Sequence, residues 1–235
     1  MTEKLVWQPE GLQGSVLFVP MSVEYMPVQR MLAFPEERQV LSFVGQVAGE
    51  CYGSSIDNEA CISRALKCVD RGHHSPFEHF NVTLRCVMDR GTSHAVVRHR
   101  HCAFQQSSTI YQNYEKTGHL TVCALPDVDP YADKEVPAMS ESEIKAYELL
   151  ALEYMVNVRG GFPPHRARDV LPNALATTLI ITTNIREWMY IMQRRRGPGD
   201  AVRMHAFAWL VREWFKKHLP DTLVAFEQWY WNHPL

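Results

Sequence analysis

Residues 80–108 read FNVTLRCVMDRGTSHAVVRHRHCAFQQSS and combine a strand pattern, a helix signal and a dense basic cluster. Apolar and polar side chains alternate from Phe80 to Val87, which is the period of a half-buried β-strand. Gly91 breaks this pattern, and Thr92 or Ser93 is expected to cap a short helix. We therefore expect the basic cluster to lie on that helix or directly after it.

The basic cluster holds two arginines and two histidines within residues 98–101, and amide and hydroxyl side chains follow at 105–108. Short basic runs are most often solvated faces. The alternative is an anion site, in which arginine forks and backbone N–H groups bind a phosphate, a carbonyl or an anionic ring. The formal net charge of the chain is −2, so there is no global basic field for nucleic acid. The clustered arginines therefore favour a small anionic ligand over a polymer.

Length and composition are those of an ordinary globular protein. The chain has 235 residues, of which 46% are hydrophobic and 21% charged, and we expect one domain over residues 1–235. The six cysteines form no C-x-x-C pair and have no zinc-ligand spacing with the histidines. No apolar run approaches the length of a membrane span. We therefore expect free thiols in a reducing cytoplasm, with no membrane partner.

The flanking segments predict strands mixed with helices. Strand patterns cover residues 14–21 and 175–183, and helical patterns cover 35–50, 58–70, 165–170 and 185–193. Because strands and helices do not alternate regularly, we predict an α+β fold with a mixed or antiparallel sheet and flanking helices. Neither a G-x-G-x-x-G nor a P-loop motif occurs, so a Rossmann or P-loop protein is not supported.

Capping residues and chain breaks predict where the remaining helices begin and end. Ser140 or Ser142 is expected to cap a long helix that ends at 160–161, and Asn184 and Asp200 are expected to cap the helices that follow them. Residues 126–137 hold several acids and prolines and predict an exposed excursion. The aromatic segment 223–231 is expected in the core or in a subunit interface.

Residues 73–79 read HHSPFEH, with three histidines and a glutamate in seven positions. Pro76 disfavours helical backbone angles at Ser75, so we expect a loop or turn here. A metal site would need further ligands, and no other cluster in the sequence supplies them. We therefore predict no metal site.

Four segments occur together and in order: HHSPFEH at 73–79, RHR followed by seven residues and a serine at 98–108, ARDVLP at 167–172, and TTNIRE with RRR at 182–196. The set resembles the flavin-dependent thymidylate synthases, the ThyX family, over about residues 40–215. A lone RHR would be a weak signal, but four segments in register are specific. The resemblance implies an α+β homotetramer whose FAD sites are built from several subunits.

The ThyX resemblance also implies an activity, the C5-methylation of dUMP with FAD as cofactor, methylenetetrahydrofolate as carbon donor and NADPH as reductant. It implies FAD contacts at Ser75, Arg98, His99, Arg100, Gln106, Asn184 and Arg186, with Tyr190 at a further flavin position. It implies nucleotide contacts at Arg98, Ser107, Ser108, Arg168 and Arg195, with Ala95 and Ile110 at two further nucleotide positions. His73 would lie on the folate side.

We predict Arg195 as the catalytic residue. Uracil C5 becomes nucleophilic when negative charge on N3, O2 and O4 of the ring is stabilised, and a guanidinium stays protonated and offers forked donors. Its neighbours Arg194 and Arg196 leave the register open, because side chains one residue apart on a helix diverge by about 100°. Cys102 lacks the sequence context of a cysteine-dependent thymidylate synthase, and we predict a packing role for it.

Four positions depart from the usual ThyX pattern: Ala95 replaces a glutamine, Ile110 a nucleotide-contacting arginine, Tyr190 a flavin-contacting asparagine and Gly199 a histidine. Losing the hydrogen-bond partner of a substrate group typically costs about 1–3 kcal/mol, so we expect altered nucleotide choice. The sequence leaves dUMP and UMP open as substrates, and a hydroxymethylating variant ranks third. A divergent ThyX member that methylates UMP in polyoxin biosynthesis, a nucleoside-antibiotic pathway, fits these changes.

The alternative from a different class is a non-catalytic nucleotide- or RNA-binding module that keeps the fold. The changes at Tyr190 and Gly199 leave it open. The retained arginines, Arg98, Arg100, Arg168, Arg186 and Arg195, argue against it.

Overall fold

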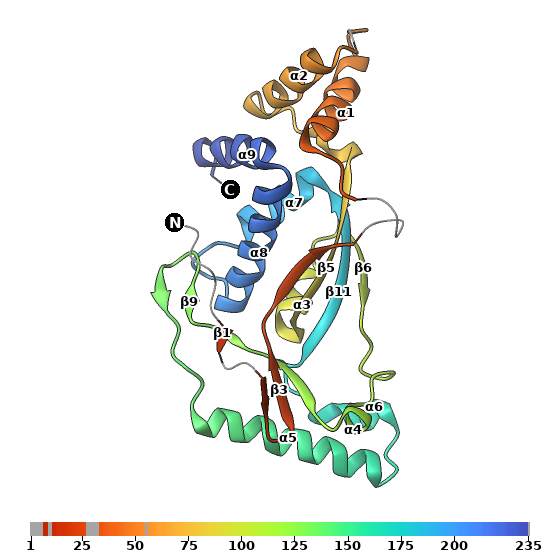
Figure 1. Ribbon diagram of the computed structural model, residues 1–235, viewed down its shortest axis with the longest axis vertical. Helices are drawn as coiled ribbons and strands as arrows, with labels where there is room; N and C mark the ends of the chain where they lie inside the picture. Colours follow the sequence, from red (N-terminus) through yellow and green to blue (C-terminus); the bar gives the residue numbers. More distant parts are fainter. Residues whose placement is uncertain (1–6, 9–10, 27–32, 55, 235) are drawn as a thin grey trace.

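The centre of the fold is a pair of long antiparallel strands in a computed structural model that describes residues 7–8, 11–26, 33–54 and 56–234. Strand β5 (Asn81–Asp89) pairs with β11 (Ala176–Asn184) along the full length of both (Figure 1). β4 (Ser22–Tyr25) adds to the free edge of β5, and β6 (Ala103–Gln106) to that of β11, which gives the order β4-β5-β11-β6. The strands predicted at residues 80–87 and 175–183 are therefore confirmed.

A second, smaller sheet lies beyond the end of the main one. It has the order β2-β3-β7, from Gly11–Gln13, Val16–Val19 and Leu120–Cys123, and β3 and β7 run parallel. An isolated bridge between Val122 and Leu175 joins it to the start of β11. Two short pairs complete the strands, β1 (Trp7–Gln8) with β8 (Leu125–Pro126) and β9 (Val128–Asp129) with β10 (Lys134–Glu135). The α+β prediction is confirmed.

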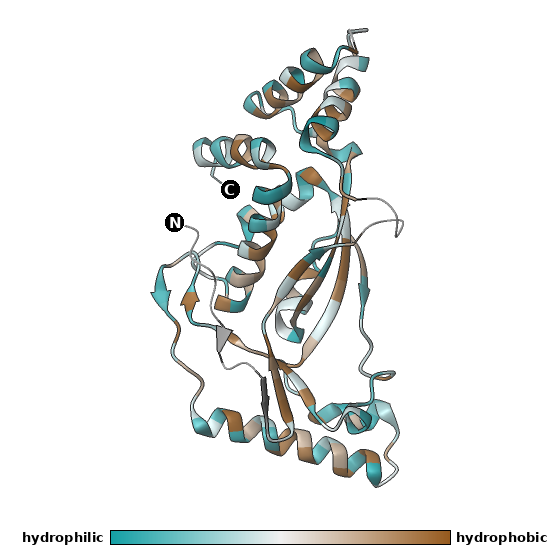
Figure 2. Ribbon diagram, in the orientation of Figure 1, coloured by the Kyte–Doolittle hydropathy of each residue, from teal (hydrophilic) through white to brown (hydrophobic). Residues whose placement is uncertain are grey.

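Helices bury the main sheet and form two hydrophobic clusters. The larger cluster joins the sheet to α1 (Glu37–Glu50), α2 (Asn58–Asp70), α7 (Ile185–Arg194), α8 (Val202–His218) and α9 (Pro220–Asn232). The smaller cluster packs β3 and β7 on α5 (Glu141–Arg159), with α4 (Tyr114–Thr117) and α6 (Pro164–Ala167) near its C-terminal end. Figure 2 shows the apolar residues along the sheet and on one face of these helices.

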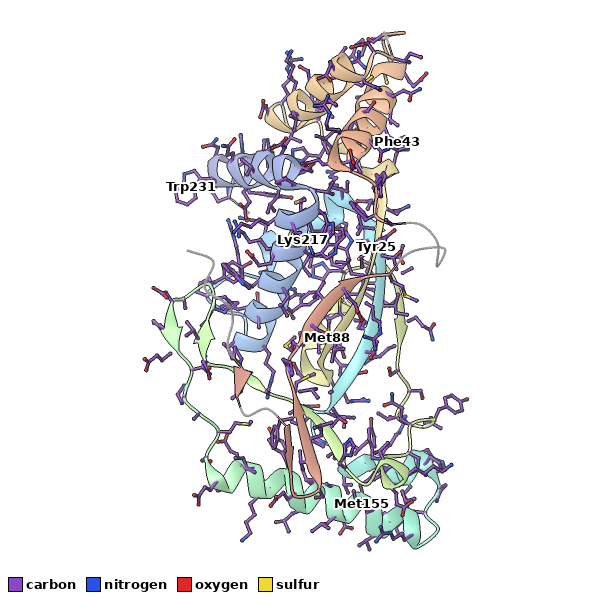
Figure 3. All side chains as sticks on the ribbon, viewed as in Figure 1. Tyr25, Phe43, Met88, Met155, Lys217 and Trp231 are labelled. Carbon is purple, nitrogen blue, oxygen red and sulfur yellow. The ribbon has the colours of Figure 1, made fainter. Side chains whose placement is uncertain are left out.

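Side-chain burial follows the strand alternation. Val82, Leu84, Cys86 and Met88 are fully buried, whereas the residues between them are half-exposed. Met88 lies in the middle of the molecule, while Trp231 projects from the surface (Figure 3). The alternation therefore fixes which face of β5 meets the helices.

Two of the predicted caps are confirmed and two predictions are wrong. Ser140 caps α5, and Asn184 Oδ1 accepts a hydrogen bond from the backbone N–H of Glu187 to cap α7. The short helix α3 (Arg90–Val96) is capped by Asp89 rather than by Thr92 or Ser93, because β5 runs two residues further than its alternation indicated. Asp200 does not cap α8: the N-cap residue is Ala201, which makes no side-chain cap hydrogen bond, and the helix begins at Val202.

Two predicted loops contain more structure than expected. Residues Ser75–His79 form a 3₁₀ helix, in which Pro76 occupies a first-turn position that needs no N–H donor. The excursion 126–137 was expected to be exposed, but it forms short strands, and Asp129 hydrogen-bonds to the buried His205. No helix in the described ranges has the length and apolarity that crossing a bilayer requires.

The contact between α1 and α2 generates a stability prediction. A Cβ on Gly45 would lie 1.8 Å from the backbone oxygen of Cys61, so the two helix backbones meet at this glycine. We expect Gly45→Ala to lower the free energy of unfolding by about 1–3 kcal/mol in chemical denaturation. Gln46→Ala, an exposed change on the next residue of α1, is the control and should stay within about 0.5 kcal/mol. Equal stabilities would contradict this contact.

Candidate active site

A cavity of about 770 Å³ lies where the loop 98–101, α7 and α9 meet. This size is in the range of cofactor and ligand pockets. Its lining is rich in arginine: five arginines face two glutamates. The lining residues are His74, Glu78, Arg98, His99, Arg100, His101, Asn184, Arg186, Glu187, Tyr190, Arg194, Arg195, Trp229 and Tyr230.

The basic loop owes its position to both of its neighbours. It follows directly on α3, and the N–H of His99 donates to the carbonyl of Val96 at 3.0 Å. The buried hydroxyl of Thr183, near the end of β11, donates to the carbonyl of His101 at 2.6 Å. The chain then pairs with β11 as β6. The cluster is therefore a fixed connection over the end of the sheet, and the prediction that it follows a short helix is confirmed.

Arg195 is held by three protein acceptors at the end of α7. Its Nε donates to His99 Nε2 at 3.0 Å, one Nη to the carbonyl of Ala95 at 3.0 Å, and the other Nη to Asp200 Oδ1 at 3.3 Å. A guanidinium has five N–H groups, so two remain for a ligand. Arg194 also lines the cavity, whereas Arg196 lines a separate small cavity with Tyr131 and Glu227.

The contact with Arg195 fixes the tautomer of His99. Because Nε2 accepts the hydrogen bond from Arg195, the proton of the neutral imidazole lies on Nδ1. Nδ1 is 3.4 Å from the carboxylate of Glu187, and His99 is buried. The edge of the Tyr190 ring packs against the imidazole at a centroid distance of 6.0 Å. Glu187, His99 and Arg195 thus form a chain of polar groups that orients the guanidinium.

Unpaired positive charge faces the rest of the cavity. Arg98 and Arg100 form no salt bridge with any residue that the structure describes, and both are exposed to the cavity. Arg186 pairs with Glu78 at the rim. Such an array of guanidinium groups suits a polyanionic ligand, in particular one with phosphate groups that accept two hydrogen bonds each.

A second polar cluster, which we call the β6 cluster, comprises Gln106, Ser107, Ser108, Thr109 and Arg168. The amide of Gln106 donates to Ser93 Oγ at 2.9 Å, and Arg168 reaches Thr109 Oγ1 at 3.5 Å. The N–H of Ser107 donates to the carbonyl of Thr178, which lies six residues before Asn184 on β11. Six strand residues span about 20 Å. None of these five residues lines the arginine cavity of the same chain.

Comparison with known proteins identifies the family. The sequence model of the Thy1 family, described as thymidylate synthase complementing protein, matches residues 37–221. The chain belongs to this family. It is the ThyX family that the four sequence motifs indicated, and the chain is a divergent member.

Curated relatives and solved structures are similar over most of the chain. The chain is 26% identical to the flavin-dependent thymidylate synthase of Corynebacterium diphtheriae over 83% of this chain and 81% of that one. It is 30% identical to that of Corynebacterium glutamicum over 72% and 71% of the two chains. The UMP/dUMP methylase PolB from Streptomyces cacaoi, bound with 5-Br dUMP, has the same fold, with a TM-score of 0.68, 20% identity, and 90% and 96% coverage.

The structure brings some of the predicted ThyX residues to the cavity and leaves others outside it. Those that line it are Arg98, His99, Arg100, Asn184, Arg186, Tyr190 and Arg195. Ala95 does not line it, but its carbonyl accepts a hydrogen bond from Arg195. Those that do not line it are Ser75, Gln106, Ser107, Ser108, Ile110 and Arg168. His73 also lies outside, in a groove with Lys67 on α2 and Arg71 directly after that helix.

The cavity includes residues that the sequence did not indicate. His74 rather than His73 lines it, and His74 packs against the rings of Phe226 and Trp229 at 4.8 and 4.4 Å. Burial lowers the pKa of His74 and favours its neutral form. The sequence around Trp229 does not indicate a ligand site, because only the tertiary structure brings α9 to the cavity. Glu187, in the TTNIRE motif, could have been found as the acidic partner of the basic loop.

Cys102 lies beside the cavity and has the properties of a packing residue. Burial raises the pKa of its thiol to about 11, although a hydrogen bond with Thr183 acts in the opposite direction. A thiol with this pKa is protonated at neutral pH, and the thiolate is the nucleophilic form. Among the described residues, no three His, Cys, Asp or Glu side chains gather as metal ligands.

The raised pKa of Cys102 generates a prediction. We expect Cys102→Ala to keep the rate of nucleotide methylation within about threefold, since this thiol is not the nucleophile. Iodoacetamide at pH 7 should leave the rate of the unmodified enzyme unchanged over the same period. A loss of methylation of a hundredfold or more in Cys102→Ala, with the fold intact, would assign the thiol a role in the chemistry.

Proposed function

We propose that this chain is a flavin-dependent enzyme that methylates a uridine monophosphate nucleotide, dUMP or UMP, at C5. Methylenetetrahydrofolate donates the carbon, NADPH reduces the flavin, and the protein acts in the cytoplasm as a homotetramer. The observation that carries the proposal is the arginine cavity, in which Arg98, Arg100 and Arg195 face one space. Membership of the Thy1 family and the names of the relatives support it.

The arginine cavity fits FAD. FAD carries a pyrophosphate, and Arg98 and Arg100 supply charge that no described acidic residue neutralises. Asn184 and Arg186 at the start of α7 would bind the same cofactor, and the ring of Tyr190 offers an apolar face. When bound, the flavin supplies the hydride for reduction of the transferred carbon.

Arg195 has the position and the free donors for the catalytic role. Two of its N–H groups are left after the bonds to His99, Ala95 and Asp200. These two N–H groups would stabilise the negative charge that develops on the oxygens of a bound uracil ring while its C5 attacks the carbon donor. In a pocket with little water this kind of stabilisation is among the largest catalytic contributions.

In this proposal, the nucleotide site consists of the arginine cavity of one subunit and the β6 cluster of another. Ser107, Ser108 and Arg168 offer hydroxyl and guanidinium donors for a nucleotide phosphate, but they lie outside the cavity of their own chain. A homotetramer that apposes the β6 cluster of one subunit with the cavity of the next would bring both to one nucleotide. Ile110, which is exposed, would lie at the same interface.

The proposed function predicts the effect of Arg195→Ala. Purified protein with FAD, NADPH, methylenetetrahydrofolate and equal dUMP and UMP should yield a methylated nucleotide that mass spectrometry identifies as dTMP or 5-methyl-UMP. We expect Arg195→Ala to lower its formation by at least 100-fold while the flavin absorbance is retained.

Arg196→Ala is the matched control, because Arg196 is the next residue but lies in a different cavity. It should keep methylation within about threefold of the unmodified protein. A protein that neither binds FAD nor methylates either nucleotide would contradict the proposed function. Full methylation in Arg195→Ala would contradict only the role of Arg195.

A further inference from the structure

His205 is a buried histidine near the start of α8 that joins two distant segments. Its Nδ1 is 2.8 and 2.9 Å from the two carboxylate oxygens of Asp129 on β9. Its Nε2 is 2.9 Å from the carbonyl oxygen of Gly197. His205 therefore ties the excursion 126–137 to the loop that follows Arg195.

Both partners of His205 are acceptors. A carbonyl oxygen only accepts hydrogen bonds, so Nε2 donates to Gly197. Burial of Asp129 acts to raise its pKa, but hydrogen bonds from the N–H groups of Tyr131 and Ala132 and from His205 outweigh it and leave the pKa lowered. The carboxylate is thus an ionised acceptor that lies beside Nδ1. The ring of His205 therefore bridges two acceptors, one at each of its nitrogens.

The carbonyl of Gly197 connects His205 to Arg195. The same oxygen accepts from the N–H of Asp200 at 3.0 Å, which closes a turn over residues 197–200. The carboxylate of Asp200 then bonds to Arg195 at 3.3 Å. Within the described chain, His205 provides the side-chain hydrogen bond to the backbone of residues 196–199. A shift of this turn would therefore move the anionic partner of the guanidinium.

We propose that His205, held by Asp129, is a positioning residue for the methylation reaction: it fixes the turn 197–200 and, through Asp200, the guanidinium of Arg195. This inference rests on the proposed role of Arg195. His205 does not line the arginine cavity. It acts because a misplacement of a catalytic group by about 1 Å can cost roughly a hundredfold in rate.

His205→Gln tests the proposal, because glutamine can donate to Gly197 or to Asp129 but cannot reach both at once as the two ring nitrogens of histidine do. We expect kcat for nucleotide methylation to fall by about 10-fold to 100-fold, with a smaller change in KM, since the stabilisation by Arg195 is strongest in the transition state. FAD affinity, followed by flavin absorbance, should change less than about threefold. Asp129→Asn, which keeps the volume of the side chain, should show the same pattern and serves where His205→Gln folds poorly.

A double-mutant cycle with Asp200→Asn separates positioning from a general structural effect. If His205 acts through Asp200, the double variant His205→Gln with Asp200→Asn should be no slower than the slower single variant. Multiplying losses would overturn the proposed route. The control is Glu227→Gln. It removes the charge of Glu227 on α9, which pairs at 2.6 Å with Arg212, a residue of the same helix as His205. It should keep kcat within about twofold.

The outcomes distinguish this inference from the proposed function. If Arg195→Ala abolishes methylation while His205→Gln and Asp129→Asn both keep wild-type kcat, the positioning role of His205 is wrong and the function stands. If Arg195→Ala retains methylation, the role of Arg195 fails, whatever His205→Gln does. A slow His205→Gln variant that also loses FAD would assign His205 to the general stability of the cavity and overturn the positioning role.

Discussion

The site depends on the three hydrogen bonds that hold the guanidinium of Arg195. The guanidinium donates them to His99 Nε2, to the carbonyl of Ala95 and to the carboxylate of Asp200, which lie on three different segments. Those segments are brought together by the full-length pairing of β5 with β11, because α3 and the basic loop follow β5 while α7 follows β11. The long antiparallel ladder is therefore the physical condition for the cavity. The helices of the larger hydrophobic cluster bury one face of the ladder, and two of them, α7 and α9, also line the cavity.

Local patterns predicted what depends on neighbouring residues. The alternation over 80–87 and the β-branched run at 175–183 gave both central strands, and Asn184 was identifiable as a cap because its side chain bonds three residues ahead. The family motifs gave the arginines of the cavity. Contacts between residues far apart in the sequence could not be predicted from local patterns. Asp129 and His205 are 76 positions apart, and Trp229 reaches the cavity from α9. Asp89 was not predicted as the cap of α3, because β5 extends two residues beyond the alternating pattern in its sequence.

The departures from the usual ThyX pattern differ in their physical weight. At Ala95 the structure uses the backbone carbonyl, which is present whatever the side chain. At Gly199 a Cβ would meet nothing within 4 Å, so this change leaves open space beside the turn that His205 anchors. Tyr190 fills space at the rim with a ring that packs on His99. The changes therefore alter the side chains in and around the cavity and leave the support of Arg195 in place.

The central claim is that the arginine cavity of one subunit and the β6 cluster of another form one site, and mixing two inactive variants tests it most directly. Arg195→Ala and Arg168→Ala subunits should each be inactive, but refolded together they should regain up to about a quarter of wild-type methylation, because in random hybrids that fraction of sites draws both intact halves. Arg195→Ala mixed with Arg100→Ala should regain none, since both residues line the same cavity. If the first mixture stays as inactive as its parents, while hybrid tetramers are shown to form, the shared site is contradicted.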